Sequence, residues 1–292
     1  MPTDPGILNI QLMFKALSGP GAASNLPPML SLSRGLQKIV DRNTSTTYSV
    51  DKAIIGKFAT ASVEAWQRGL HSFLMSASLT TASPIWSSVA GYYSSHYTMR
   101  AFAHLLGFFQ LFNLKKIIKL DLAGNGYAID VISRNAGDRE HRVYWRLVHE
   151  STFFRSDPFF YHNDDAPPPP GTMQDFISDG GHRNRANYGD HIGLFPVFTP
   201  LNDTDLELRL DKLSKIEIND PPRPNVDRFP DIDNVQLIAY HRILKYRAFL
   251  DEILSTSKGF WAKQRDPSWK PAYFDFQATG VNYSGFLSDM TA

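Results

Sequence analysis

The stretch from Trp86 to Phe112, WSSVAGYYSSHYTMRAFAHLLGFFQLF, has the clearest helical periodicity in the chain. Its apolar and aromatic positions recur every three or four residues, which places them on one side of an α-helix. These positions are Ala90, Tyr93, Tyr97, Ala101, Leu105 and Phe108, whereas Ser94, Ser95 and Thr98 fall mostly off that side. Because the apolar stripe is wide, we expect this helix at the centre of a bundle rather than on its surface.

Three polar side chains, His96, Arg100 and His104, share one flank of the same helix. Residues four positions apart are neighbours on a helix surface, so these side chains should lie close together. They form either a hydrogen-bonded rim of the core or part of a binding site.

Two further helices are predicted to pack beside this one. The first runs from Lys57 to Ser78, and a turn containing Pro84 then joins it to the central helix as an antiparallel hairpin. The second runs from Val235 to Ser255 and has a continuous apolar side. Leu30 to Val40 is predicted to form one or two amphipathic turns, and Thr204 to Ile218 a further helix or mixed element.

Between these helices the hydrophobic period changes from 3.6 to 2 residues. Alternation in Lys115 to Leu122 and in Tyr127 to Arg134, joined by AGNG, predicts a β-hairpin. The segment Glu140 to Glu150 is predicted to form a third strand, with Val143, Trp145 and Leu147 on one face and Arg142, Tyr144 and Arg146 on the other. The second face is either a basic, aromatic platform for single-stranded nucleic acid or solvated arginine leaning on a tyrosine.

These patterns predict a mainly α fold, an antiparallel helical bundle with an inserted β-hairpin or small antiparallel sheet, α+β overall. Residues 1–57 should form an irregular and helical arm, and residues 58–256 the helical domain. That domain contains the β insertion at about 115–150 and a proline-rich loop at about 156–181, which is a stiff connector or a proline-rich ligand motif. Residues 257–292 should form an aromatic tail that packs on the bundle.

Composition narrows the function classes. The chain has 292 residues and a net charge of +1, so binding to nucleic acid would need a local basic patch. It has no cysteine, which excludes disulfides, thiolate nucleophiles and cysteine-bound zinc. There is no pattern of a secretory leader and no apolar run long enough to span a bilayer, so we expect a soluble, cytoplasmic protein without a membrane partner.

Sequence motifs for metal or phosphate binding are missing, and neither a metal site nor a cofactor is predicted. The chain has no Gly-Lys-Ser phosphate loop, no His-Glu-x-x-His and no Gly-x-Gly-x-x-Gly after a strand. Besides the stretch from Trp86 to Phe112, a second distinctive segment is the short basic sequence HRNRANYGDH, from His182 to His191.

Both distinctive segments resemble HEPN domains. AGYYSSHYTMRAFAHLL is similar to the central HEPN helix, which has a tyrosine pair, small residues, an aromatic or histidine, and then Arg-Ala before an apolar tail. RNRANYGDH resembles the Arg-x-x-Ala-Asp-Tyr-Gly text of one HEPN branch, with Asn187 in place of the aspartate. The helix from Val235 resembles the closing helix of that bundle.

Many HEPN proteins are metal-independent ribonucleases that carry an arginine, four to six residues and then a histidine, with two copies meeting across a dimer. The resemblance therefore implies Arg185 and His191 as catalytic residues. It implies the following residues for substrate or phosphate binding: Arg183, Asn187, Tyr188, His96 and Arg100. Histidine would exchange a proton with the attacking 2′-hydroxyl or the leaving oxygen, while arginine would hold the phosphate.

The arginine–histidine spacing also occurs elsewhere in the chain, at Arg134 with His141, Arg142 with His149 and Arg155 with His162, but without HEPN-like sequence around it.

Three hypotheses about function follow from these residues. The chain is a homodimeric endoribonuclease, such as a toxin or anti-phage effector with an antitoxin or defence-system partner. Alternatively, it is a catalytically silent HEPN-like module that binds a nucleotide, RNA or a protein. In the third, HRNRANYGDH is a structural corner in which arginines bond carbonyls.

Overall fold

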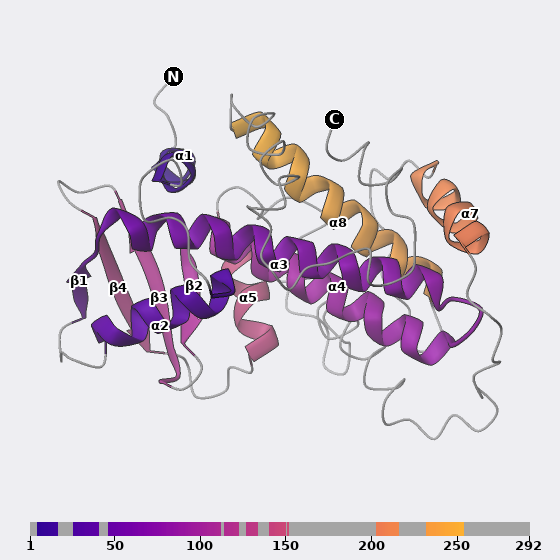
Figure 1. The fold of residues 1–292 in the computed structure, drawn as a ribbon, viewed down its shortest axis with the longest axis horizontal. Coiled ribbons are helices and arrows are strands. Elements are labelled where there is room, and N and C mark those ends of the chain that lie inside the picture. The colour runs from indigo at the N-terminus through magenta and orange to yellow at the C-terminus, as the bar shows by residue number, and fades with distance from the viewer. Residues whose placement is uncertain are drawn as a thin grey trace, which may run out of the picture.

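The computed structural model describes residues 5–16, 26–40, 46–111, 114–122, 127–133, 140–149, 151, 203–215 and 232–253. Its helices are α1 (Pro5–Ala16), α2 (Pro28–Val40), α3 (Lys52–Ser78), α4 (Pro84–Leu105), α5 (Glu140–His149), α7 (Asp203–Ser214) and α8 (Ile232–Ile253). Its strands are β1 (Thr47–Ser49), β2 (Phe108–Leu111), β3 (Lys116–Asp121) and β4 (Ala128–Ser133). The predicted fold class is confirmed, since a helical bundle is combined with a small antiparallel sheet (Figure 1).

The long helices α3 and α4 form the predicted antiparallel hairpin (Figure 1). Asp51 caps α3 by accepting a hydrogen bond from the Ile54 amide at 2.8 Å. The two helices approach closely where α3 has Gly69, because a Cβ there would lie 2.6 Å from Thr98 Oγ1. Close contact also lets the Ser62 hydroxyl of α3 donate to the Ala101 carbonyl of α4 at 2.7 Å.

The face of α4 that packs on α3 differs from the prediction. Ser94, Ser95 and Thr98 are buried, whereas Tyr93 and Tyr97 are only half-buried. The prediction that the serines and the threonine lie off the core side is therefore wrong. Close packing against α3 requires small side chains, and their polar atoms can bond to helix carbonyls, as Thr98 does with the Ser94 carbonyl at 2.9 Å.

The central helix also ends earlier than Phe112. Gly107 has a φ of +84°, and its amide donates to the His104 carbonyl at 3.0 Å. Glycine adopts this left-handed conformation without a steric penalty, which is why it terminates helices. The chain reverses there, and residues 108–111, predicted as helix, instead form β2.

The four strands pair in the order β1-β4-β3-β2, all antiparallel. The predicted hairpin is confirmed as β3 and β4, with Ile118 opposite Val131. Strand β1 comes from the N-terminal segment and pairs with β4, so the sheet includes residues outside the predicted insertion. Figure 1 shows the sheet beside the first half of α3, and Phe109 of β2 meets Phe58 of α3 edge-to-face at 6.3 Å.

The predicted third strand is wrong, because residues 140–149 form helix α5. Val143, Tyr144, Leu147 and Val148 are all buried, and their spacing of one, three and one residues fits one side of a helix. Alternation is satisfied by Val143, Trp145 and Leu147 alone, if Tyr144 and Val148 are left out. Tyr144 is fully buried, so it does not form the predicted exposed platform.

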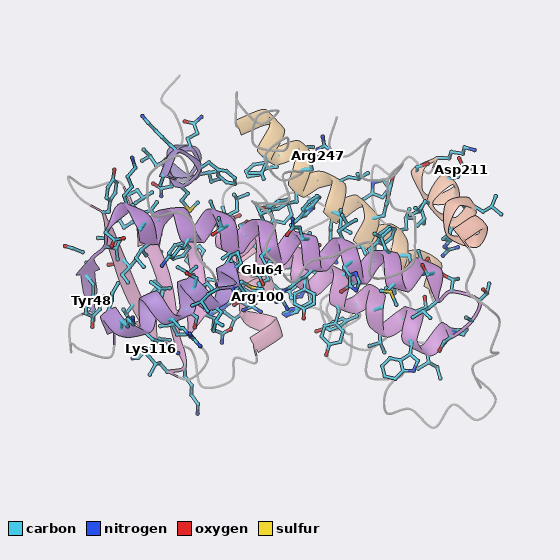
Figure 2. All side chains as sticks on the ribbon, viewed as in Figure 1. Tyr48, Glu64, Arg100, Lys116, Asp211 and Arg247 are labelled. Carbon is cyan, nitrogen blue, oxygen red and sulfur yellow. The ribbon has the colours of Figure 1, made fainter. Side chains whose placement is uncertain are left out.

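Helix α8 completes the bundle and confirms the helix predicted from Val235 (Figure 2). Its Tyr246 stacks on Trp66 of α3 at 5.8 Å. The single hydroxyl proton of Ser62 goes to Ala101, so the Tyr246 hydroxyl donates to Ser62 at 2.7 Å. Burial raises the pKa of Tyr246 above its ordinary value, which keeps this donor protonated.

A second polar cluster joins α8 to the far end of the hairpin. The Gln236 amide nitrogen lies 3.0 Å from the Ser76 carbonyl, 2.8 Å from Thr80 Oγ1 and 3.0 Å from Ser87 Oγ. Its carbonyl oxygen accepts from Arg209 Nε of α7 at 2.6 Å. One buried amide thus connects four helices.

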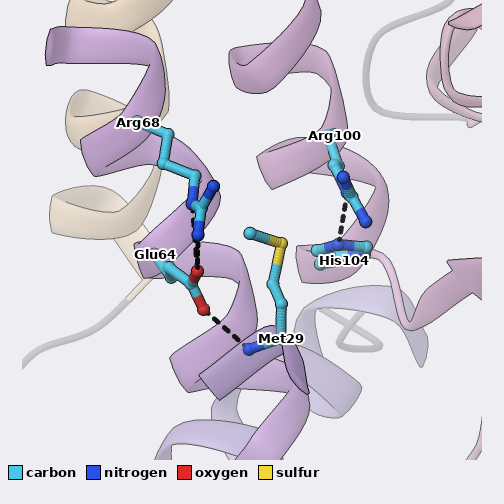
Figure 3. A network of polar contacts seen from close by, with 5 residues as sticks. All are labelled: Met29, Glu64, Arg68, Arg100 and His104. Atoms are coloured by element: carbon cyan, nitrogen blue, oxygen red, sulfur yellow. Dashed lines mark hydrogen bonds and ion pairs between the residues drawn. The ribbon is translucent and has the colours of Figure 1, made fainter. Parts of the chain in front are cut away.

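Helix α2 is held by a buried carboxylate of α3 (Figure 3). Glu64 Oε2 accepts from the Met29 amide in the first turn of α2 at 2.6 Å, and its Oε1 lies 2.8 Å from Arg68 Nη2. An anion is stabilised at a helix N-terminus by the helix dipole. Within the described residues, no helix is both long and apolar enough to cross a membrane.

Candidate phosphate-binding site

The candidate site is centred on Arg100, which lies near the C-terminal end of α4 (Figure 2). Its side chain is half-buried. The Arg100 Nε lies 3.4 Å from His104 Nε2 (Figure 3), and the guanidinium carbon lies 5.2 Å from the ring centroid of Tyr144. A hydrogen bond on one edge and an aromatic ring beside the guanidinium fix its orientation.

His104 supports this arginine from inside the core. Its Nδ1 lies 2.8 Å from the Phe108 carbonyl, which can only accept, so Nδ1 carries the proton. The other ring nitrogen, Nε2, therefore has the lone pair that accepts from Arg100 Nε. The ring stacks on Phe109 at 4.9 Å and meets Tyr144 edge-to-face at 5.6 Å.

Burial, together with the positive charge of Arg100, lowers the pKa of the His104 imidazole to about 3, against the opposing effect of the hydrogen bond to Phe108. His104 is consequently neutral near neutral pH. Both ring nitrogens are already bonded, so this histidine is suited to holding Arg100 rather than to proton transfer.

His96 lies one turn before Arg100 and is also buried. Its ring contacts Tyr97 at 5.6 Å, Tyr144 at 6.1 Å and Tyr92 at 6.4 Å between centroids. Of the three polar residues predicted on this flank, the two histidines lie inside the core and Arg100 lies at its edge.

Two arginines lie over neighbouring rings of α5. Arg100 lies over Tyr144, and Arg242 of α8 lies 4.5 Å from the ring centroid of Trp145. A guanidinium whose orientation is fixed can bind phosphate oxygens with defined geometry.

Sequence reasoning brought His96, Arg100 and His104 together but missed Tyr144 and Trp145. Both belong to the segment that alternation predicts as a strand. The apolar spacing from Val143 to Val148 was the signal that could have placed them on a helix.

The predicted residues Arg183, Arg185, Asn187, Tyr188 and His191 lie outside the described residues. Their roles therefore stay predictions. In the part of the chain that the structure describes, no group of three or more histidine, aspartate or glutamate side chains could hold a metal ion.

Comparison of the chain with protein-family models, with curated proteins and with solved structures found no match. The resemblance to HEPN domains consequently depends on the sequence of the two segments and of the helix from Val235 alone.

Proposed function

We propose that this chain is a HEPN-like module that binds RNA, with Arg100 holding a backbone phosphate. The observation that supports the proposal is the fixed guanidinium of Arg100, held by His104 Nε2 and the ring of Tyr144. An arginine whose guanidinium is already fixed in orientation loses less side-chain entropy when it binds a ligand.

A second candidate function is metal-independent cleavage of RNA, favoured by the HEPN-like text around Arg185 and His191. Here His191 would transfer the proton and Arg185 would stabilise the charge on phosphate. Arg183, Asn187 and Tyr188 would help to bind the substrate, whereas His96, also predicted for this role, is buried among aromatic rings. Such an enzyme would act as a homodimer in the cytoplasm, as a toxin or anti-phage effector that an antitoxin or defence-system protein restrains, without a metal or cofactor.

Binding is tested by fluorescence anisotropy with a labelled short single-stranded RNA in the presence of chelator. Arg100→Ala should weaken binding about 10- to 100-fold, the range expected for a hydrogen-bonded charge pair. The matched control is Lys119→Ala, which removes one positive charge from an exposed position on β3 and should change binding less than about twofold. Equal affinities of Arg100→Ala and the parent would refute the proposed role of Arg100.

Cleavage is tested on the same RNA by gel electrophoresis, again in chelator. His191→Ala and Arg185→Ala should abolish cutting while they retain binding, because Arg100 is intact in both. If the parent protein leaves a broad panel of RNAs uncut, the ribonuclease hypothesis fails and the binding function is the one that stands.

A further inference from the structure

We draw no further inference here: the strongest candidate, the surface patch at the start of α4 where Trp86 is exposed beside the partly exposed Pro84 and Ile85, is an apolar face on which nothing in the structure shows what covers it.

Discussion

His104 provides a test of the site that needs no ligand. The substitution His104→Asn replaces the imidazole with a neutral amide, which can still donate to the Phe108 carbonyl but cannot titrate. The packing contacts of the ring are lost at every pH. The informative quantity is therefore not the stability of the variant at one pH but the change in its free energy of unfolding between two pH values.

The sign and size of this change follow from the two states of His104. In the folded chain the pKa is about 3, and in the unfolded chain it is the ordinary 6.5. Between these values the unfolded state binds a proton that the folded state excludes, so stability is fully present above about pH 6.5 and is lost as the pH falls toward about 3. From about pH 7.5 to about pH 5.5 the loss contributed by this one group is about 1.4 kcal/mol.

The assay is urea unfolding followed by far-UV circular dichroism at both pH values and constant ionic strength. The parent should lose about 1.4 kcal/mol more than His104→Asn over this interval. Burial also lowers the pKa of His71, but His71 is present in both proteins and cancels in the comparison. If both proteins lose stability in parallel, His104 accepts a proton in the folded state and cannot be the neutral acceptor that orients Arg100.

Three other substitutions, two of them with a matched control, test the packing of the bundle, each by urea unfolding with an unchanged m-value. Glu64→Ala leaves the first turn of α2 without its acceptor and should cost about 2–3 kcal/mol. Asp211→Ala breaks an exposed ion pair of the same spacing and should cost under about 0.5 kcal/mol, so equal losses would contradict the role of burial. Gly69→Ala places a Cβ against the backbone of α4 and should cost about 1–3 kcal/mol. The control is Gly35→Ala, whose Cβ would meet mainly the end of the flexible Ile54 side chain. It should be nearly neutral, since alanine favours a helix by up to about 1 kcal/mol relative to glycine. If Gly69→Ala is as stable as Gly35→Ala, close packing at Gly69 is refuted. Gln236→Leu should cost about 2 kcal/mol by leaving buried hydroxyls without a donor, and an unchanged midpoint would show that the amide is dispensable.

The helices and the β3–β4 hairpin were predictable because their signals are local. Periods of 3.6 and 2 residues identify them, and AGNG between the two strands is a typical turn sequence. The segment from Val143 to Leu147 was ambiguous, since three apolar residues at every second position satisfy a strand while their neighbours Tyr144 and Val148 satisfy a helix. Gly107 was the signal missed in the central helix, because a glycine inside an apolar run does not reveal its φ value.

The site was predictable only in part. Helical spacing alone places Arg100 next to His104. Tyr144 comes from a helix some forty residues later, as the numbering shows, and its position depends on how α5 packs against α4. The protonated nitrogen of His104 depends on the Phe108 carbonyl, which is brought back toward the helix by the reversal at Gly107. Contacts of this kind are set by tertiary structure and leave no pattern in the sequence.

The interface between α3 and α4 explains why an aromatic stripe lies on the outside of a central helix. Gly69, Ser94 and Thr98 allow the two backbones to approach so closely that no ring fits between them. Tyr93 and Tyr97 then lie half-buried on another side of the helix, together with Arg100. Close packing by small residues and the half-buried position of Arg100 are therefore two consequences of one arrangement, and a substitution that enlarges the interface should disturb both stability and RNA binding. Gly69→Ala tests this link, because it adds a methyl group on α3 and changes neither Arg100 nor the residues that contact it, His104 and Tyr144. Weaker RNA binding by a variant that is still folded would show that the spacing of the two helices sets the position of Arg100.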